Sequence, residues 1–104
     1  MQEHHSVLIH AIENRLRVQF KYKGTDEEVA TLRTVEPWVY GYRNGKEALL
    51  GYQVEPIAMT RRYDLRRVKH IEIVDGPCEN HPEQIDLSVW EFIHARHLPR
   101  AEAA

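Results

Sequence analysis

Five basic residues and a single acid fall within one ten-residue stretch, RRYDLRRVKH. In an extended strand, alternate side chains point to opposite faces. Arg61 and Arg67 would then share one face with Tyr63, and Arg62 and Arg66 would lie on the other. Planar guanidinium groups bind phosphate and carboxylate through two parallel hydrogen bonds. We therefore predict an anion-binding face around Arg61 and Arg67, with Arg62 and Arg66 as a secondary basic surface.

Two structural explanations compete with this prediction. Charged side chains on an edge strand prevent sheets from associating, and the basic stretch could serve that purpose alone. Arg67 could also form a salt bridge in the interior, with Glu36 or Asp64 as its partner. The sequence leaves both explanations open.

Residue types that support catalysis or metal binding are present without the spacing that such chemistry needs. The seven histidines include His94 and His97, but they form no His-Glu-x-x-His motif, and Cys78 has no second cysteine beside it as a metal ligand. No serine lies in a nucleophile elbow, and no glycine-rich phosphate loop is present. We expect no metal, no cofactor and no enzymatic activity.

Length and composition favour one small globular domain over 1–104. The net charge of −2 conceals an asymmetry, because residues 1–70 carry 12 Lys/Arg against 9 Asp/Glu and residues 71–104 carry 2 against 7. The apolar runs are too short to span a membrane, and a single cysteine fits a reducing compartment. We expect a cytoplasmic protein that has a cationic face, an acidic tail at 77–104 and no membrane partner.

The N-terminal segment, 1–15, predicts a short helix over Ser6–Asn14. Apolar residues recur there at the spacing that places them on one face of a helix. These residues are Leu8, Ala11, Ile12 and Leu16. Ser6 is a suitable residue to cap the start of this helix.

The hydrophobic period then changes to two, which predicts strands. Val18, Phe20 and Tyr22 alternate with polar residues. A second extended run covers Val29–Arg43, and Pro37 within it implies a bend or an edge position.

Asn44-Gly45 is the strongest hairpin signal in the chain. The cross-strand pairs that a two-residue turn predicts are Arg43–Lys46, Tyr42–Glu47, Tyr40–Leu49 and Trp38–Gly51. We interpret the aromatic row of Trp38, Tyr40 and Tyr42 as core rather than as a platform for stacking, with Tyr42 the most exposed of the three.

Two further strands are predicted over Arg61–Arg66 and Val68–Val74, followed by a C-terminal helix over Leu87–His97 that Asp86 would cap. The main packing residues of that helix would be Trp90 and Ile93. Five closely spaced strands favour a mainly β (α+β) fold, with a small five-stranded barrel over 16–76.

Several segments, taken in order and with their spacing, resemble the WYL domain family over Ile9 to Val74. The matching segments are Ile9–Arg15, VQFKY at Val18–Tyr22, RTVEP at Arg33–Pro37, LLGY at Leu49–Tyr52, and the string of Arg61, Tyr63, Leu65, Arg67 and Val68. The family's Trp-Tyr-Leu triplet is replaced by Glu47-Ala48-Leu49, and no helix-turn-helix domain precedes the match. The chain thus resembles a free-standing WYL-like domain, which implies an Sm-like/SH3-like barrel in a bacterial sensor.

The resemblance also implies a ligand site. WYL-like domains are thought to bind anionic ligands, including nucleotides and single-stranded nucleic acid, through a basic patch. Matched by position, that patch corresponds to Arg61 and Arg67, with Arg33, Tyr22 and Tyr63 as neighbours. Tyrosine suits such a site because it can stack on a base.

Three functions follow as expectations. The first is a regulatory module in transcription that recognises an anionic, nucleotide-like effector. The second is a small barrel that binds single-stranded RNA or DNA directly, although the net charge of −2 and the acidic tail argue against it. The third is a structural module that forms a homo-oligomer or joins a partner chain.

Overall fold

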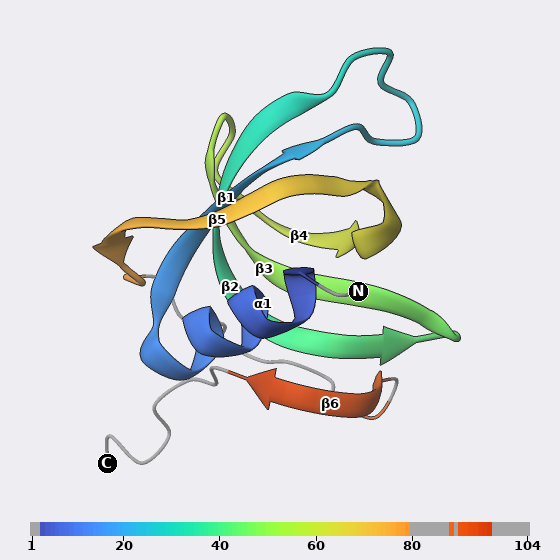
Figure 1. Ribbon diagram of the computed structural model, residues 1–104. Helices are drawn as coiled ribbons and strands as arrows, with labels where there is room; N and C mark the ends of the chain where they lie inside the picture. The colour runs from blue at the N-terminus through green and yellow to red at the C-terminus, as the bar shows by residue number, and fades with distance from the viewer. Residues whose placement is uncertain (1–2, 80–87, 89, 97–104) are drawn as a thin grey trace.

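The computed structural model describes residues 3–79, 88 and 90–96 (Figure 1). Its elements, in chain order, are α1 (Glu3–Asn14), β1 (Leu16–Tyr22), β2 (Thr31–Arg43), β3 (Lys46–Glu55), β4 (Met59–Asp64), the 3-10 turn η1 (Leu65–Arg67), β5 (Val68–Pro77) and β6 (Trp90–Arg96). None of the helices in these ranges is long and apolar enough to cross a membrane.

The strands form one antiparallel sheet in the order β4-β3-β2-β1-β5. β2 is the long central strand, and its last part also pairs with β6. Figure 1 shows the sheet curled, with β5 passing across β1 and α1 packed beside β6. The mainly β class is confirmed. No ladder joins β4 to β5 among the described strands, so the expected closed barrel is not confirmed.

α1 is amphipathic in the way that the sequence predicts. Leu8, Ala11 and Ile12 are buried, and they pack into the main core. The helix begins at Glu3 rather than at Ser6, so the expected capping role of Ser6 is wrong. Ser6 is an exposed residue within the first turns.

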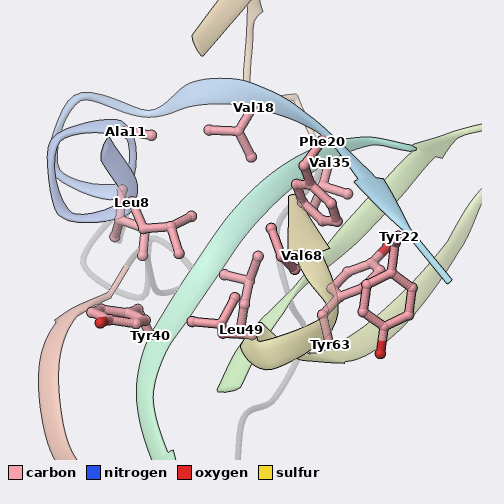
Figure 2. Packing of buried hydrophobic residues seen from close by; sticks show 12 residues of the cluster. Leu8, Ala11, Val18, Phe20, Tyr22, Val35, Tyr40, Leu49, Tyr63 and Val68 are labelled. Carbon is pink, nitrogen blue, oxygen red and sulfur yellow. The ribbon is translucent and has the colours of Figure 1, made fainter. Parts of the chain in front are cut away.

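The main core joins α1 to the inner face of the sheet. Val18 and Phe20 on β1 are fully buried, as their alternation predicts. Figure 2 shows side chains from the helix and the strands converging on one cluster, with Tyr22 and Tyr63 at the end farthest from α1. This aromatic end of the core carries the candidate site.

The turn between β2 and β3 has the conformation that its sequence favours. Asn44 and Gly45 have φ values of 56° and 75°, as a two-residue hairpin turn requires. The predicted pair of Arg43 and Lys46 is confirmed. The pairs Tyr42–Glu47 and Tyr40–Leu49 are confirmed as well.

The expected pairing of Trp38 with Gly51 is wrong. The register shifts between Pro37 and Val39, which places Gly51 opposite Pro37. A Cβ at Gly51 would lie 2.5 Å from the carbonyl oxygen of Glu36. Close approach of the two backbones therefore explains this glycine.

The aromatic row of β2 belongs mostly to the core, as expected. Trp38 and Tyr40 are buried, whereas Tyr42 is partly exposed. Trp38 stacks on Tyr52, with the ring centroids 6.3 Å apart, and it belongs to a second, smaller cluster that includes Trp90.

The predicted C-terminal helix is wrong, because residues 90–96 form the strand β6. This strand pairs with the last part of β2, whose backbone groups on that side would otherwise lack a ladder partner. Trp90 is buried as predicted, but against strand residues. Asp86 and the side chain of Ile93 lie outside the described residues.

Candidate functional site: an arginine–tyrosine cluster

Residues from three strands meet at the aromatic end of the core. Tyr22 ends β1, Arg33 lies near the start of β2, and Arg61 and Tyr63 lie on β4. The rings of Tyr22 and Tyr63 meet edge to face with their centroids 5.0 Å apart. The Arg33 guanidinium carbon lies 5.4 Å from the Tyr22 centroid, and that of Arg61 lies 5.6 Å from Tyr22 and 5.7 Å from Tyr63. The sheet therefore assembles four of the five residues predicted for the ligand site.

Arg33 is buried, and partners within the protein occupy its guanidinium. Its Nη2 donates to both carboxylate oxygens of Glu27, at 2.8 and 2.9 Å. Its Nη1 donates to Gln53 Oε1 at 2.9 Å, and its Nε donates to Thr31 Oγ1 at 2.8 Å. An arginine bonded in this way holds the loop before β2 against the sheet. It has no free pair of N–H groups with which to bind a ligand.

Tyr63 is fully buried, and its hydroxyl donates to Gln53 Oε1 at 2.9 Å. Burial raises the pKa of Tyr63 well above its ordinary value, although the charges of Arg61 and Arg33 act in the opposite direction. The phenol therefore stays protonated and remains a hydrogen-bond donor.

Arg61 differs from Arg33 in its surroundings. It is partly exposed, and its guanidinium packs on the two tyrosine rings. Within the described residues, this guanidinium forms no hydrogen bond or ion pair.

Glu27 is the nearby acid, and its pKa is lowered chiefly by the hydrogen bond from the Gly24 amide. The pKa of Glu27 is lowered further by the charge of Arg33 and, to a smaller extent, by that of Arg61. Glu27 pairs with Arg33 alone, so the two guanidinium groups and one carboxylate leave a surplus positive charge centred on Arg61.

Arg67 lies outside β4, in the turn η1. The predicted strand over Arg61–Arg66 ends at Asp64, because the Asp64 side chain accepts a hydrogen bond from the Arg66 amide and starts the turn η1. Strand alternation therefore stops there, and the expected common face of Arg61 and Arg67 is wrong. Arg67 is exposed, and its Nη1 donates to the carbonyl of Lys23 at 3.3 Å.

The alternative salt bridges proposed for Arg67 are not found. Glu36 pairs with Arg17 at 3.2 Å, and Asp64 pairs with Arg66 at 2.9 Å. Arg66 thus has a partner on its own turn, whereas Arg62 is exposed. The predicted secondary basic surface consists of one paired and one solvated arginine.

Sequence reasoning missed two polar residues that organise the cluster. Gln53 is buried, accepts from both Arg33 and Tyr63, and donates to the carbonyl of Ile57 at 2.8 Å. Glu27 lies in a loop whose composition gives no sign that it reaches back to β2. Both contacts depend on the path of the loops, which no local pattern reports.

The described residues hold no group of three or more side chains suited to a metal ion. Burial, with a smaller contribution from the charge of Glu36, raises the pKa of the Cys78 thiol to about 12. Such a thiol is a poor nucleophile, because the thiolate is the reactive form.

Two of three comparisons with known proteins find a match. The model of the WYL domain matches residues 3–73. Among solved structures, the chain is similar to Proteasome accessory factor B/C (PafBC) of Arthrobacter aurescens, with a TM-score of 0.68 and 23% identity over 79% of this chain. The match spans 13% of that protein. No curated protein matches the chain.

Proposed function

The chain belongs to the WYL domain family, and on this premise we propose that it is a regulatory module that recognises an anionic, nucleotide-like effector through the arginine–tyrosine cluster. In this proposal the curled sheet is a variant of the family's Sm-like/SH3-like barrel, and the module acts in bacterial transcriptional regulation in the cytoplasm. Recognition regulates an assembly or a partner only if the effector prefers one of two states.

The state of Arg61 is the observation that carries the proposal. Its guanidinium is held against two aromatic rings and is partly exposed, while Arg33 beside it neutralises Glu27. A guanidinium restricted by stacking loses less conformational entropy when it binds a phosphate than a freely rotating one does. Arg61 is thus a pre-oriented cation at the rim of an organised polar cluster.

Thermal unfolding in the presence of AMP tests the proposal. A ligand at about 100 times its Kd stabilises the folded state by about 2.7 kcal/mol, and a domain of this size then melts roughly ten degrees higher. We expect a saturable rise for the wild type, a much smaller rise in Arg61→Gln, and the full rise in Arg66→Gln, which removes an arginine already paired with Asp64.

The same variants with a fluorescein-labelled single-stranded oligodeoxythymidylate decide between a nucleotide and a nucleic-acid strand. Binding of the strand but not of AMP, with a steep loss as salt rises, would replace the nucleotide with single-stranded nucleic acid as the effector. Binding of neither probe, or equal binding by wild type and Arg61→Gln, would overturn the proposal. A defined oligomer that forms without any ligand would then favour the assembly function.

A further inference from the structure

A second basic site lies at the tip of the β2–β3 hairpin, beside the end of β4. A groove of about 310 Å³ opens there. Its lining residues are Tyr22, Arg43, Asn44, Lys46, Glu47, Ala48, Arg62, Tyr63 and Asp64. Tyr22 and Tyr63 also belong to the arginine–tyrosine cluster, whereas neither Arg61 nor Arg33 lines the groove. Arg62 and Asp64 lie on the opposite face of β4 from Arg61.

The charges in this groove are unequally matched. Both of its acids have partners, since Asp64 is bound by Arg66 at 2.9 Å and Glu47 accepts a hydrogen bond from Tyr40. Arg43, Lys46 and Arg62 form no ion pair in the described part of the chain, although the charge of Lys46 contributes to lowering the pKa of Asp64. Glu47 keeps its charge, so the groove holds three cations against two carboxylates, one of which is already paired with Arg66.

The hairpin register brings two of these cations together. Arg43 and Lys46 are direct cross-strand partners at the end of the ladder, and like charges in such a pair destabilise the sheet. The rigid two-residue turn of Asn44 and Gly45 fixes this arrangement. A bound anion would relieve the repulsion between Arg43 and Lys46. Without an anion, the hairpin retains that repulsion.

The floor of the groove decides which part of a ligand it can recognise. Tyr22 is 5% exposed and Tyr63 is fully buried, so neither ring offers a free face on which a base could stack. Recognition must come from the cations and from polar groups at the rim. The volume lies at the small end of the range for ligand pockets.

We propose that this hairpin groove binds the phosphate group of a small diphosphate or phosphomonoester through Arg43, Lys46 and Arg62, rather than through Arg61 and Arg33. Guanidinium and ammonium groups that line one groove suit a multiply charged phosphate, because each can add a charge-assisted hydrogen bond. The nucleoside part of a nucleotide contributes little to binding at this groove.

Titration of the ¹⁵N-labelled full chain with inorganic pyrophosphate, followed by amide NMR, tests the proposal. We expect saturable shifts at Asn44, Gly45 and Ala48. Lys46→Gln and Arg62→Gln should each weaken binding about tenfold, since a hydrogen bond to a charged group contributes roughly that factor. AMP should give the same pattern of shifts at the hairpin, and adenosine should give none.

Two controls separate this site from general charge and from the proposed function. Lys69→Gln removes an exposed lysine that does not line the groove. The affinity of this variant for pyrophosphate should equal that of the wild type. Arg61→Gln should keep the shifts at Asn44 and Gly45 even if it abolishes binding at the arginine–tyrosine cluster.

Lys46→Gln adds a readout that a general loss of structure would not give. Without pyrophosphate this variant should melt slightly higher than the wild type, because the opposed pair with Arg43 is gone. Three outcomes would overturn the proposal: no saturable shift at the hairpin, an equal loss of affinity in Lys69→Gln, or shifts centred on Gly24 and Arg61.

Discussion

The arginine–tyrosine cluster and the hairpin groove differ in how much of their positive charge the protein itself engages. In the cluster, Arg33 is buried, and Glu27, Gln53 and Thr31 take up its donors. In the groove, no ion pair within the described residues engages Arg43, Lys46 or Arg62. The number of arginines in a region therefore does not identify a binding site. A binding site is identified by the number of hydrogen-bond donors that the protein leaves unused.

Removal of Arg33 should produce the largest effect. Truncation of one partner of a buried ion pair costs about 3–5 kcal/mol, and we expect about 3 kcal/mol for Arg33→Ala because Glu27 stays partly exposed. Urea unfolding followed by circular dichroism measures this loss. Arg62→Ala, an exposed arginine on the adjacent strand face, should change the free energy of unfolding by less than about 0.5 kcal/mol. Equal losses in the two variants would remove the distinction between the regions.

A smaller effect is expected from Tyr63→Phe, which deletes only the hydroxyl that donates to Gln53. The loss should be about 1 kcal/mol, because Gln53 Oε1 still accepts from Arg33. Tyr52→Phe is the matched control, since Tyr52 contributes its ring by stacking on Trp38. A Tyr63→Phe variant as stable as the wild type would show that the Gln53 hydrogen bonds do not organise the cluster.

The pH dependence of stability should report Glu27. Its pKa is lowered in the folded protein from an ordinary value of 4.5, so its carboxylate stabilises the fold above that value. The contribution should disappear as the pH falls from about 4.5 toward the lowered pKa of the folded state. Acid unfolding of wild type and Glu27→Gln measures the difference. Parallel curves over this range would contradict the assigned role of the Glu27–Arg33 pair.

The smallest effect belongs to the exposed pair of Arg66 and Asp64. Arg66→Gln should leave the free energy of unfolding close to that of the wild type, because the Arg66 side chain is 68% exposed and solvent screens the pair. The Arg66 amide still donates to Asp64, so η1 should persist. A loss comparable to that of Arg33→Ala in the same urea series would mean that solvated arginines stabilise this fold as strongly as the buried one.

Local patterns predicted the parts of the fold that local forces decide. The helical spacing of Leu8, Ala11 and Ile12 and the alternation along β1 both correspond to buried faces. The Asn44-Gly45 turn set the register of the hairpin, and that register already places Arg43 opposite Lys46. The second basic region was therefore accessible from the sequence, although the groove around it was not.

The wrong predictions arise where distant or single contacts override a local pattern. The helical spacing expected over Leu87–His97 gave way to β6, because β2 offered a long ladder edge. One hydrogen bond from the Arg66 amide to the Asp64 carboxylate ended the strand alternation that had placed Arg67 beside Arg61. A register shift at Pro37 moved Trp38 away from Gly51. The roles of Glu27 and Gln53 needed the loop paths, which the sequence does not encode locally.

The most direct test of the division between Arg33 and Arg61 follows the side-chain Nε–H signals of the arginines by NMR while AMP is added. The account predicts that the Arg61 signal shifts saturably. The Arg33 signal, held by Thr31 Oγ1 at 2.8 Å, should exchange slowly with solvent and stay in place. An Arg61 signal that does not respond, or an Arg33 signal that shifts with it, would contradict the claim that Arg61 recognises the effector while Arg33 supports the fold.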